Sequence, residues 1–104
     1  MARVHVVAVI TAKPGKRAEV LAAFQANVPA VHAEEGCIEY GATVDVADAG
    51  PIQTKFGEDT FVVVEKWESL DALKAHAAAP HMAAYGAKVK DLLAGRAVHV
   101  LEDA

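Results

Sequence analysis

The sequence has little that would support a disulfide, a metal centre or a nucleotide site. Cys37 is the only cysteine in 104 residues, so neither an internal disulfide nor a zinc finger can form. The glycines never fall in a Gly-x-Gly-x-x-Gly pattern, which leaves flavin and nicotinamide binding without support. His76 and His81 are separated by a proline and lack the i, i+4 spacing that holds zinc on one helical face. We therefore expect no metal and no cofactor.

Long apolar runs and basic clusters are also missing. No apolar run approaches membrane-spanning length, and the N-terminal segment lacks the apolar core and cleavage site of a signal peptide. The net charge is −4 with scattered lysine and arginine, whereas nucleic-acid binding requires a basic stripe. We expect a cytoplasmic protein, a single domain over residues 1–104, that binds neither nucleic acid nor membrane.

Hydrophobic residues make up 54% of the chain, and their spacing predicts alternating strands and helices. Residues 45–59 form the longest irregular connection, either a lid or a wide hairpin loop. The order β-α-β-β-α-β is that of a ferredoxin-like α+β fold, with an antiparallel four-stranded sheet and helices on one face. The predicted elements are a strand at 4–11, a helix from about 14 to 34 ended by Gly36, strands at 37–46 and 60–68, a short helix after Ser69 with Leu70, Leu73 and Ala77 on its apolar face, a helix from Pro80 to Gly95, and a strand at 96–101.

The strands also predict a second copy of the chain. In the first strand Val4, Val6, Ala8 and Ile10 alternate with other apolar residues, so both faces of the sheet are apolar. The helices cover only one of these faces. We expect the other face to pack against a second copy, giving a homodimer whose sheets form a barrel.

Five polar or aromatic positions are candidates for chemistry, and each has a structural alternative. Asn27 lies within the apolar stripe of its helix and either bonds to the carbonyl freed by Pro29 or contacts a ligand. Glu65 is either a pocket acid or a hydrogen-bonding group between strands or subunits. Trp67 either belongs to the core or walls a pocket and donates from its N–H.

The two histidines remain open in the same way. His76 is a packing or capping residue, or a catalytic one. His81 lies at a predicted helix N-terminus, where exposed N–H groups favour the neutral imidazole that could act as a base. Its alternative is a simple surface residue.

Several stretches together resemble the antibiotic biosynthesis monooxygenase family in order and spacing. They are Glu35-Gly36-Cys37-Ile38-Glu39-Tyr40, Phe61-Val62-Val63-Val64-Glu65-Lys66-Trp67-Glu68, Ala75-His76, and Ala79-Pro80-His81-Met82. The resemblance implies a dimeric α+β barrel and the oxidation of quinols or polycyclic phenols by O₂ without flavin, metal or haem. The family also contains isomerases of a phosphorylated sugar and haem-degrading relatives. The connection at 45–59 is longer than usual for the family.

This resemblance extends to individual positions. Asn27, His76 and His81 match polar positions of the family, and Glu65 with Trp67 matches its Glu-x-Trp strand. We therefore expect a cofactor-independent monooxygenase that oxidises a quinol or phenolic aromatic molecule with O₂. The alternatives are an isomerase-type enzyme acting on a small sugar-like metabolite and a non-catalytic dimer that binds small molecules or serves a stress response.

The expected mechanism assigns a role to each residue. His81 takes a proton from a quinol hydroxyl, with His76 as the alternative base, while Asn27 and Trp67 hydrogen-bond the oxyanion. We expect these four residues to line one cavity between the sheet and the helices. Tyr40 or Tyr85 packs against the substrate ring, and Glu65 is the next residue to test as a base.

Overall fold

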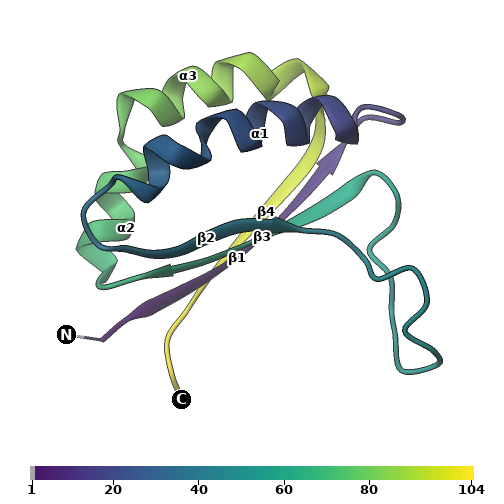
Figure 1. Ribbon diagram of the computed structural model, residues 1–104, viewed down its shortest axis with the longest axis horizontal. Coiled ribbons are helices and arrows are strands. Elements are labelled where there is room, and N and C mark those ends of the chain that lie inside the picture. The colour runs from purple at the N-terminus through teal and green to yellow at the C-terminus, as the bar shows by residue number, and fades with distance from the viewer. Residues whose placement is uncertain (1) are drawn as a thin grey trace.

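The computed structural model describes residues 2–104 and has the predicted ferredoxin-like α+β fold. Its sheet is antiparallel with the strand order β2-β3-β1-β4. All helices lie on one side of the sheet (Figure 1). The elements are β1 (Val4–Ala12), α1 (Arg17–His32), β2 (Cys37–Thr43), β3 (Thr60–Trp67), α2 (Leu70–Ala77), α3 (Pro80–Val89), a 3₁₀ turn (Lys90–Leu92) and β4 (Leu93–Leu101).

The central strand β1 explains how the sheet divides into two faces. Its residues alternate between buried and half-buried from end to end, because successive side chains point to opposite faces. Val6 and Ala8 face the helices, whereas Val7 and Val9 face away from them. The register places Val64 opposite Val7 on that uncovered face. Both faces of the sheet are therefore apolar, as the sequence predicts.

Several predicted boundaries differ from the structure. α1 begins at Arg17 and ends at His32, and β2 ends at Thr43. The last helix ends at Val89 instead of Gly95, because pairing with β1 draws the following residues into the sheet. Gly95 lies opposite Thr11 in that ladder and does not end a helix.

Gly36 forms a tight corner between α1 and β2. Its φ is +85°, a left-handed conformation that side chains rarely adopt, and a Cβ placed there would lie 2.6 Å from the Cβ of Ala72. Its carbonyl accepts a 2.9 Å hydrogen bond from the backbone N–H of Glu68. This corner brings the end of α1 against the start of α2, and glycine is required because no other residue fits so close to α2.

The connection at 44–59 extends away from the helices (Figure 1). The Asp45 carboxylate accepts hydrogen bonds from the backbone N–H groups of Gly57 at 2.9 Å and Phe56 at 3.1 Å. These bonds lower the pKa of Asp45. The loop is therefore closed by its own side chain. In the described residues no helix is long and apolar enough to cross a membrane.

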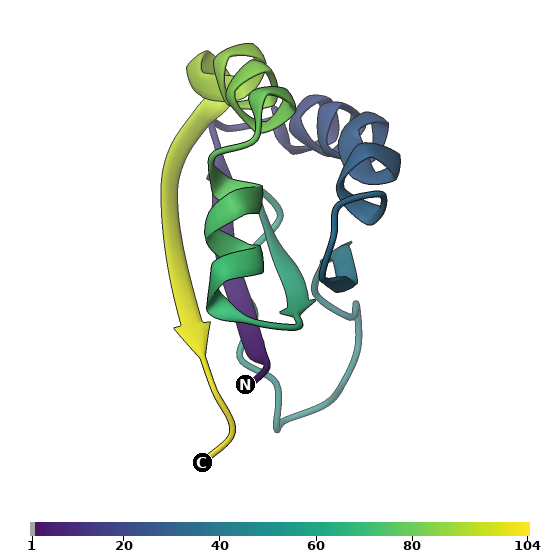
Figure 2. The ribbon, with the colours of Figure 1, turned by 90° about the vertical axis from the view of Figure 1, so that its left-hand side faces the viewer.

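The two edge strands differ in how far the helices cover them. Figure 2 shows β2 and β4 at opposite edges of the sheet, with α2 in front of the strands between them. α1 packs over β2, whereas Val98 and Val100 of β4 remain 46% and 49% exposed. The side of the fold along β4 is therefore the more open one.

Candidate active site

A cavity of about 380 Å³ lies between the sheet and the helices. This volume falls within the usual range for small-molecule sites. Much of its wall is apolar and comes from β1, β3 and α1, including Val6, Ala8, Ile10, Val63 and Phe24. The polar and charged lining residues are Tyr40, Glu65, His76, Tyr85, Lys90 and Arg96.

His76 is the most buried titratable residue of this cavity, with 4% of its surface exposed. Ser69 caps α2 by accepting a 3.1 Å hydrogen bond from the N–H of Ala72, so the short helix is fixed at its start. The imidazole lies between two aromatic rings, with its centroid 4.7 Å from Trp67 and 5.4 Å from Tyr40. These contacts hold the ring of His76 in one orientation.

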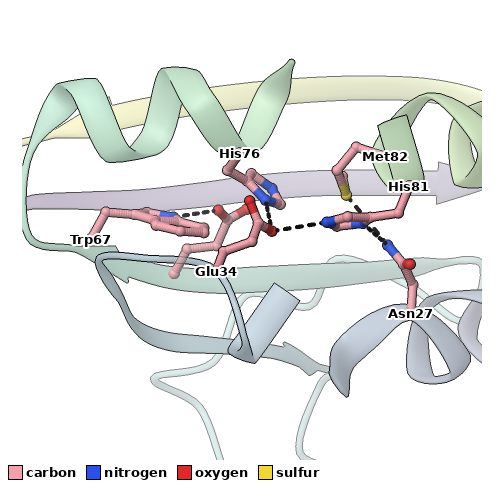
Figure 3. Close-up of polar contacts among 7 residues, drawn as sticks. Asn27, Glu34, Trp67, His76, His81 and Met82 are labelled. Atoms are coloured by element: carbon pink, nitrogen blue, oxygen red, sulfur yellow. Dashed lines mark hydrogen bonds and ion pairs between the residues drawn. The ribbon is translucent and has the colours of Figure 1, made fainter. Parts of the chain in front are cut away.

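Glu34 accepts the hydrogen bond that sets the tautomer of His76. The distance from His76 Nδ1 to Glu34 Oε2 is 2.8 Å, and the Glu34 side chain is only 16% exposed (Figure 3). A carboxylate can only accept, so Nδ1 carries the proton. In the neutral ring Nε2 then keeps its lone pair and can act as a base.

The same carboxylate oxygen also contacts His81. His81 Nε2 lies 3.2 Å from Glu34 Oε2 but is poorly aligned for a hydrogen bond, so the contact is mainly electrostatic. His81 Nδ1 accepts a 3.2 Å hydrogen bond from Asn27 Nδ2, which also contacts Met82 Sδ at 3.4 Å. A polar network thus runs from Asn27 through His81 and Glu34 to His76 (Figure 3).

Glu65 is a buried acid next to this network. It is 7% exposed and its Oε1 accepts a 2.9 Å hydrogen bond from the indole N–H of Trp67. Burial raises the pKa of Glu65, and the Trp67 bond and the nearby His76 oppose this effect only in part. Glu65 is therefore more readily protonated than an exposed glutamate.

Two tyrosines, Tyr40 and Tyr85, line the cavity. The ring of Phe24 stacks on Tyr40 at 5.1 Å and meets Tyr85 edge-on at 6.3 Å. Burial raises the pKa of both tyrosines, while Arg96 acts in the opposite direction on Tyr85. Both hydroxyls therefore stay protonated at neutral pH and can donate hydrogen bonds.

The prediction that four residues line one cavity is wrong for three of them. Only His76 lines it. Asn27 and His81 lie along a separate shallow groove between α1 and α3, where the Asn27 amide bonds to α3 and not to the carbonyl freed by Pro29. Trp67 is fully buried and reaches the cavity only through the bond that its N–H donates to Glu65.

Glu65, Tyr40 and Tyr85 do line the cavity, as a substrate site would require. Sequence reasoning missed Glu34, which was assigned only to the end of a helix, and it missed the cations Lys90 and Arg96 at the cavity wall. The signal for Glu34 is its position two residues before the Gly36 corner. No residue of the 44–59 connection lines this cavity, so the loop is not its lid within one chain.

The arrangement resembles an acid–base site more than a metal site. In the described part of the chain, no group of three or more His, Cys, Asp or Glu side chains is arranged so that it could hold a metal ion. Glu34 joins His76 and His81 through a single oxygen, which both histidines approach. One imidazole nitrogen of His76 remains available for proton transfer.

Comparisons with known proteins agree on one family. The family model described as antibiotic biosynthesis monooxygenase matches residues 3–88. The chain is 44% identical over 87 residues to the probable quinol monooxygenase YgiN of Escherichia coli K12, covering 82% of this chain and 83% of that protein. It is 37% identical over 86 residues to the putative monooxygenase YcnE of Bacillus subtilis, covering 83% and 81% of the two chains.

Solved structures share the whole fold. Rv0793 from Mycobacterium tuberculosis superposes with a TM-score of 0.80 at 30% identity, covering 99% of this chain and 96% of that one. A putative antibiotic biosynthesis monooxygenase from Caulobacter crescentus CB15 gives a TM-score of 0.82 at 28% identity, covering 99% and 91%. The likeness therefore includes β4, which lies beyond the family model's match.

Proposed function

Because the chain belongs to the antibiotic biosynthesis monooxygenase family, we propose that this monooxygenase oxidises a quinol or related phenolic aromatic with O₂, without a bound cofactor. The relative YgiN is named a probable quinol monooxygenase, which supports this substrate class. The apolar wall of the 380 Å³ cavity suits an aromatic ring better than a sugar.

The observation that carries the proposal is the hydrogen bond between Glu34 and His76. In the neutral imidazole this bond places the proton on Nδ1 and leaves Nε2 with a free lone pair, on a buried ring that lines the cavity. A general base needs a free lone pair, a fixed orientation and access to the substrate. His81 meets these needs less well, because both of its ring nitrogens already face protein groups. We therefore assign the base to His76, and His81 holds Glu34 in place.

The proposed reaction begins with the proton of a substrate hydroxyl. His76 Nε2 accepts this proton, and the electron-rich phenolate passes one electron to O₂. Recombination of the two radicals forms a carbon–oxygen bond and a ring peroxide. The proton on His76 returns to the distal oxygen and gives a ring hydroperoxide. The peroxide-bearing carbon then loses its own proton, the O–O bond breaks, and the distal oxygen takes this second proton and leaves as water while the ring becomes a hydroxyquinone. The substrate supplies all four electrons that O₂ accepts, so the protein needs no reductant.

Tyr40 and Tyr85 stabilise the negative charge that develops on the substrate oxygen. Burial raises the pKa of both tyrosines, so their hydroxyls keep the protons that hydrogen-bond donation requires. This assignment replaces Asn27 and Trp67 as direct donors, since neither lines the cavity. Glu65, whose pKa burial also raises, remains the second candidate for the base. Trp67 instead orients Glu65 by its 2.9 Å hydrogen bond.

The proposal includes a homodimer formed through the uncovered face of the sheet. That face carries Val7, Val9, Val62 and Val64, and an apolar surface of this kind is typically covered in solution. We also place the protein in the cytoplasm, where its unpaired Cys37 is compatible with a reducing environment. Sedimentation and cell fractionation test these two assignments.

The activity itself is tested by oxygen uptake. Purified protein, stripped of metal and free of flavin, is mixed with a panel of dihydroxynaphthalenes, and O₂ consumption is measured against the substrate alone. We expect a protein-dependent rate and a product that contains one atom from ¹⁸O₂. If no substrate is consumed faster than its own autoxidation, the protein is not a quinol monooxygenase.

A further inference from the structure

Two cations line the end of the cavity that lies away from His76. Lys90 comes from the 3₁₀ turn after α3 and Arg96 from β4, and both side chains are exposed. Within residues 2–104 neither forms a salt bridge or a side-chain hydrogen bond. Their charges are therefore available to a ligand, although the chain as a whole has a net charge of −4.

The sheet register separates these cations from the catalytic end. Glu65 lies opposite Val6 of β1, whereas Arg96 lies opposite Ile10, four residues further along the same strand. β3 and β4 lie on either side of β1, so two strand spacings and the rise of four residues separate Glu65 from Arg96. Their Cα atoms are therefore roughly 16 Å apart. The cavity thus has one end with Glu65 and His76 and another end with two cations.

Apolar side chains separate the two ends. Ala8 and Val63 occupy the middle of the sheet wall, and Phe24 faces them from α1. A molecule that spans the cavity must therefore be apolar and flat in its centre and polar at both ends. An aromatic ring system fits this sequence of environments, whereas a sugar would place hydroxyl groups against the apolar middle.

We propose that Lys90 and Arg96 bind a carboxylate on the substrate, so that the enzyme selects dihydroxy-aromatic acids over neutral quinols. The inference rests on the proposed function of the same site. The guanidinium of Arg96 matches a carboxylate in geometry, and Lys90 adds a second point charge. With its carboxylate at this end, the substrate presents its hydroxyl group to His76. The charge on Arg96 also reaches Tyr85 in the cavity wall, where it opposes the effect of burial on the tyrosine pKa.

Binding of non-oxidisable probes tests the proposal independently of oxygen chemistry. Calorimetry compares 2-naphthoate with 2-naphthamide, which has the same shape but no charge. We expect the carboxylate to bind wild-type protein about tenfold more tightly, the effect of one hydrogen bond to a charged group. In the double variant Lys90→Gln/Arg96→Gln this preference should disappear, while the affinity for the amide stays the same.

A matched control removes two positive charges elsewhere. Arg3→Gln/Lys13→Gln has the same net charge as the test variant, and both side chains are exposed outside the cavity. The control should keep the full preference for the carboxylate. If both double variants lose it equally, the effect is one of overall charge and the site does not exist.

Three other results overturn the inference. Equal affinity of wild-type protein for the two probes removes the carboxylate site. Tighter binding of ribose 5-phosphate than of 2-naphthoate assigns the cations to a sugar phosphate. If the test variant changes the sedimentation mass and leaves probe binding unchanged, the cations bind a second copy of the chain. Probe binding without any quinol oxidation, in contrast, rejects the proposed function and keeps the anion site.

Discussion

The imidazole of His76 and the carboxylate of Glu34 are joined by a 2.8 Å hydrogen bond although 42 residues separate them in the chain. Both side chains are largely buried, so the bond is shielded from water, and the charge of the carboxylate strengthens it. The second contact of the same carboxylate, with His81, keeps Glu34 at this position. Residues from the connection after α1, from α2 and from α3 thus converge on the orientation of a single ring.

Replacing Glu34 by Gln should lower kcat while KM changes little. The amide keeps the shape of the side chain but removes the charge that selects the reactive tautomer of His76. We expect a loss of about 10- to 100-fold, a part of the 10²–10⁴-fold that a positioned base provides. Oxygen uptake under saturating quinol measures it.

Glu35→Gln is the matched control, because Glu35 is the exposed neighbour and has no hydrogen-bond partner within residues 2–104. Its kcat should equal that of the wild type. In a variant that already carries His76→Ala, Glu34→Gln should cause little further loss of kcat, because the effects of two residues that act as a unit are not additive. An undiminished further loss in the double variant would show that Glu34 acts apart from His76.

Glu65 makes the stability of the protein depend on pH. Burial raises the folded-state pKa of this acid above its ordinary value of 4.5, so the folded protein favours the protonated form. The raised pKa therefore adds to the stability of the fold at low pH. This stabilisation is fully present below pH 4.5 and is lost as the pH rises through the folded-state pKa. For each pKa unit by which the folded state differs from the unfolded state at Glu65, the free energy of unfolding changes by about 1.4 kcal/mol.

We therefore expect Glu65→Gln to become more stable relative to the wild type as the pH rises from acidic to neutral. The glutamine cannot ionise, and its amide oxygen can still accept the bond from Trp67. Thermal unfolding of both proteins across this range measures the difference. Glu58→Gln, in the exposed connection, should show no such trend. A difference in Tm that stays constant with pH would contradict a raised pKa at Glu65.

Gly36→Ala should destabilise the protein by about 1–3 kcal/mol, the usual cost of strained backbone. The added Cβ meets Ala72 at 2.6 Å, and the φ of +85° is unfavourable for alanine. Because α2 carries His76, its displacement should also lower kcat. Gly41→Ala is the control, since a Cβ there has no neighbour within 4 Å. Denaturant unfolding measures both variants, and equal stability would contradict the corner model.

The fold could be predicted because β1 and the glycine corner leave few choices. Alternating apolar residues on both faces of β1 require a covered sheet. Gly36 has the left-handed conformation that its sequence context indicates, although α1 already ends at His32. The error at Gly95 has a physical cause. The sequence signal of a helix-ending glycine competes there with strand pairing, and only the register with Thr11 decides between them.

The site was predicted less well, because its geometry depends on contacts between distant elements. Leu70 was expected on the apolar face of α2, but it is 45% exposed and His76 points inward instead. A helix of eight residues is too short for its periodicity to show which face is buried. Gly36 marks the corner near Glu34 in the sequence, but only the folded chain shows that this corner brings Glu34 within hydrogen-bond distance of His76.

The uncovered face of the sheet gives a prediction about assembly. Val64 lies on that face opposite Val7 and is 36% exposed in the single chain. We expect wild-type protein at micromolar concentration to sediment as a dimer of the 10.9 kDa chain. Val64→Lys places a charge in the interface and should yield the monomer. Ile52→Lys, at a 92% exposed position in the connection, should remain a dimer. A monomeric wild type rules out the barrel.

The last prediction separates the two histidines. His76→Ala should reduce kcat about 10²–10⁴-fold, because it removes the only imidazole among residues 2–104 that lines the cavity. His81→Ala should reduce kcat by less than about tenfold, because it removes one contact of Glu34 and leaves the hydrogen bond between Glu34 and His76 intact. Oxygen uptake by metal-stripped, flavin-free variants measures both, and circular dichroism confirms that each remains folded. A larger loss for His81→Ala would return the role of base to His81. If neither variant slows oxygen uptake, Glu65→Gln becomes the test, because Glu65 is then the remaining proton acceptor among the buried groups at that end of the cavity.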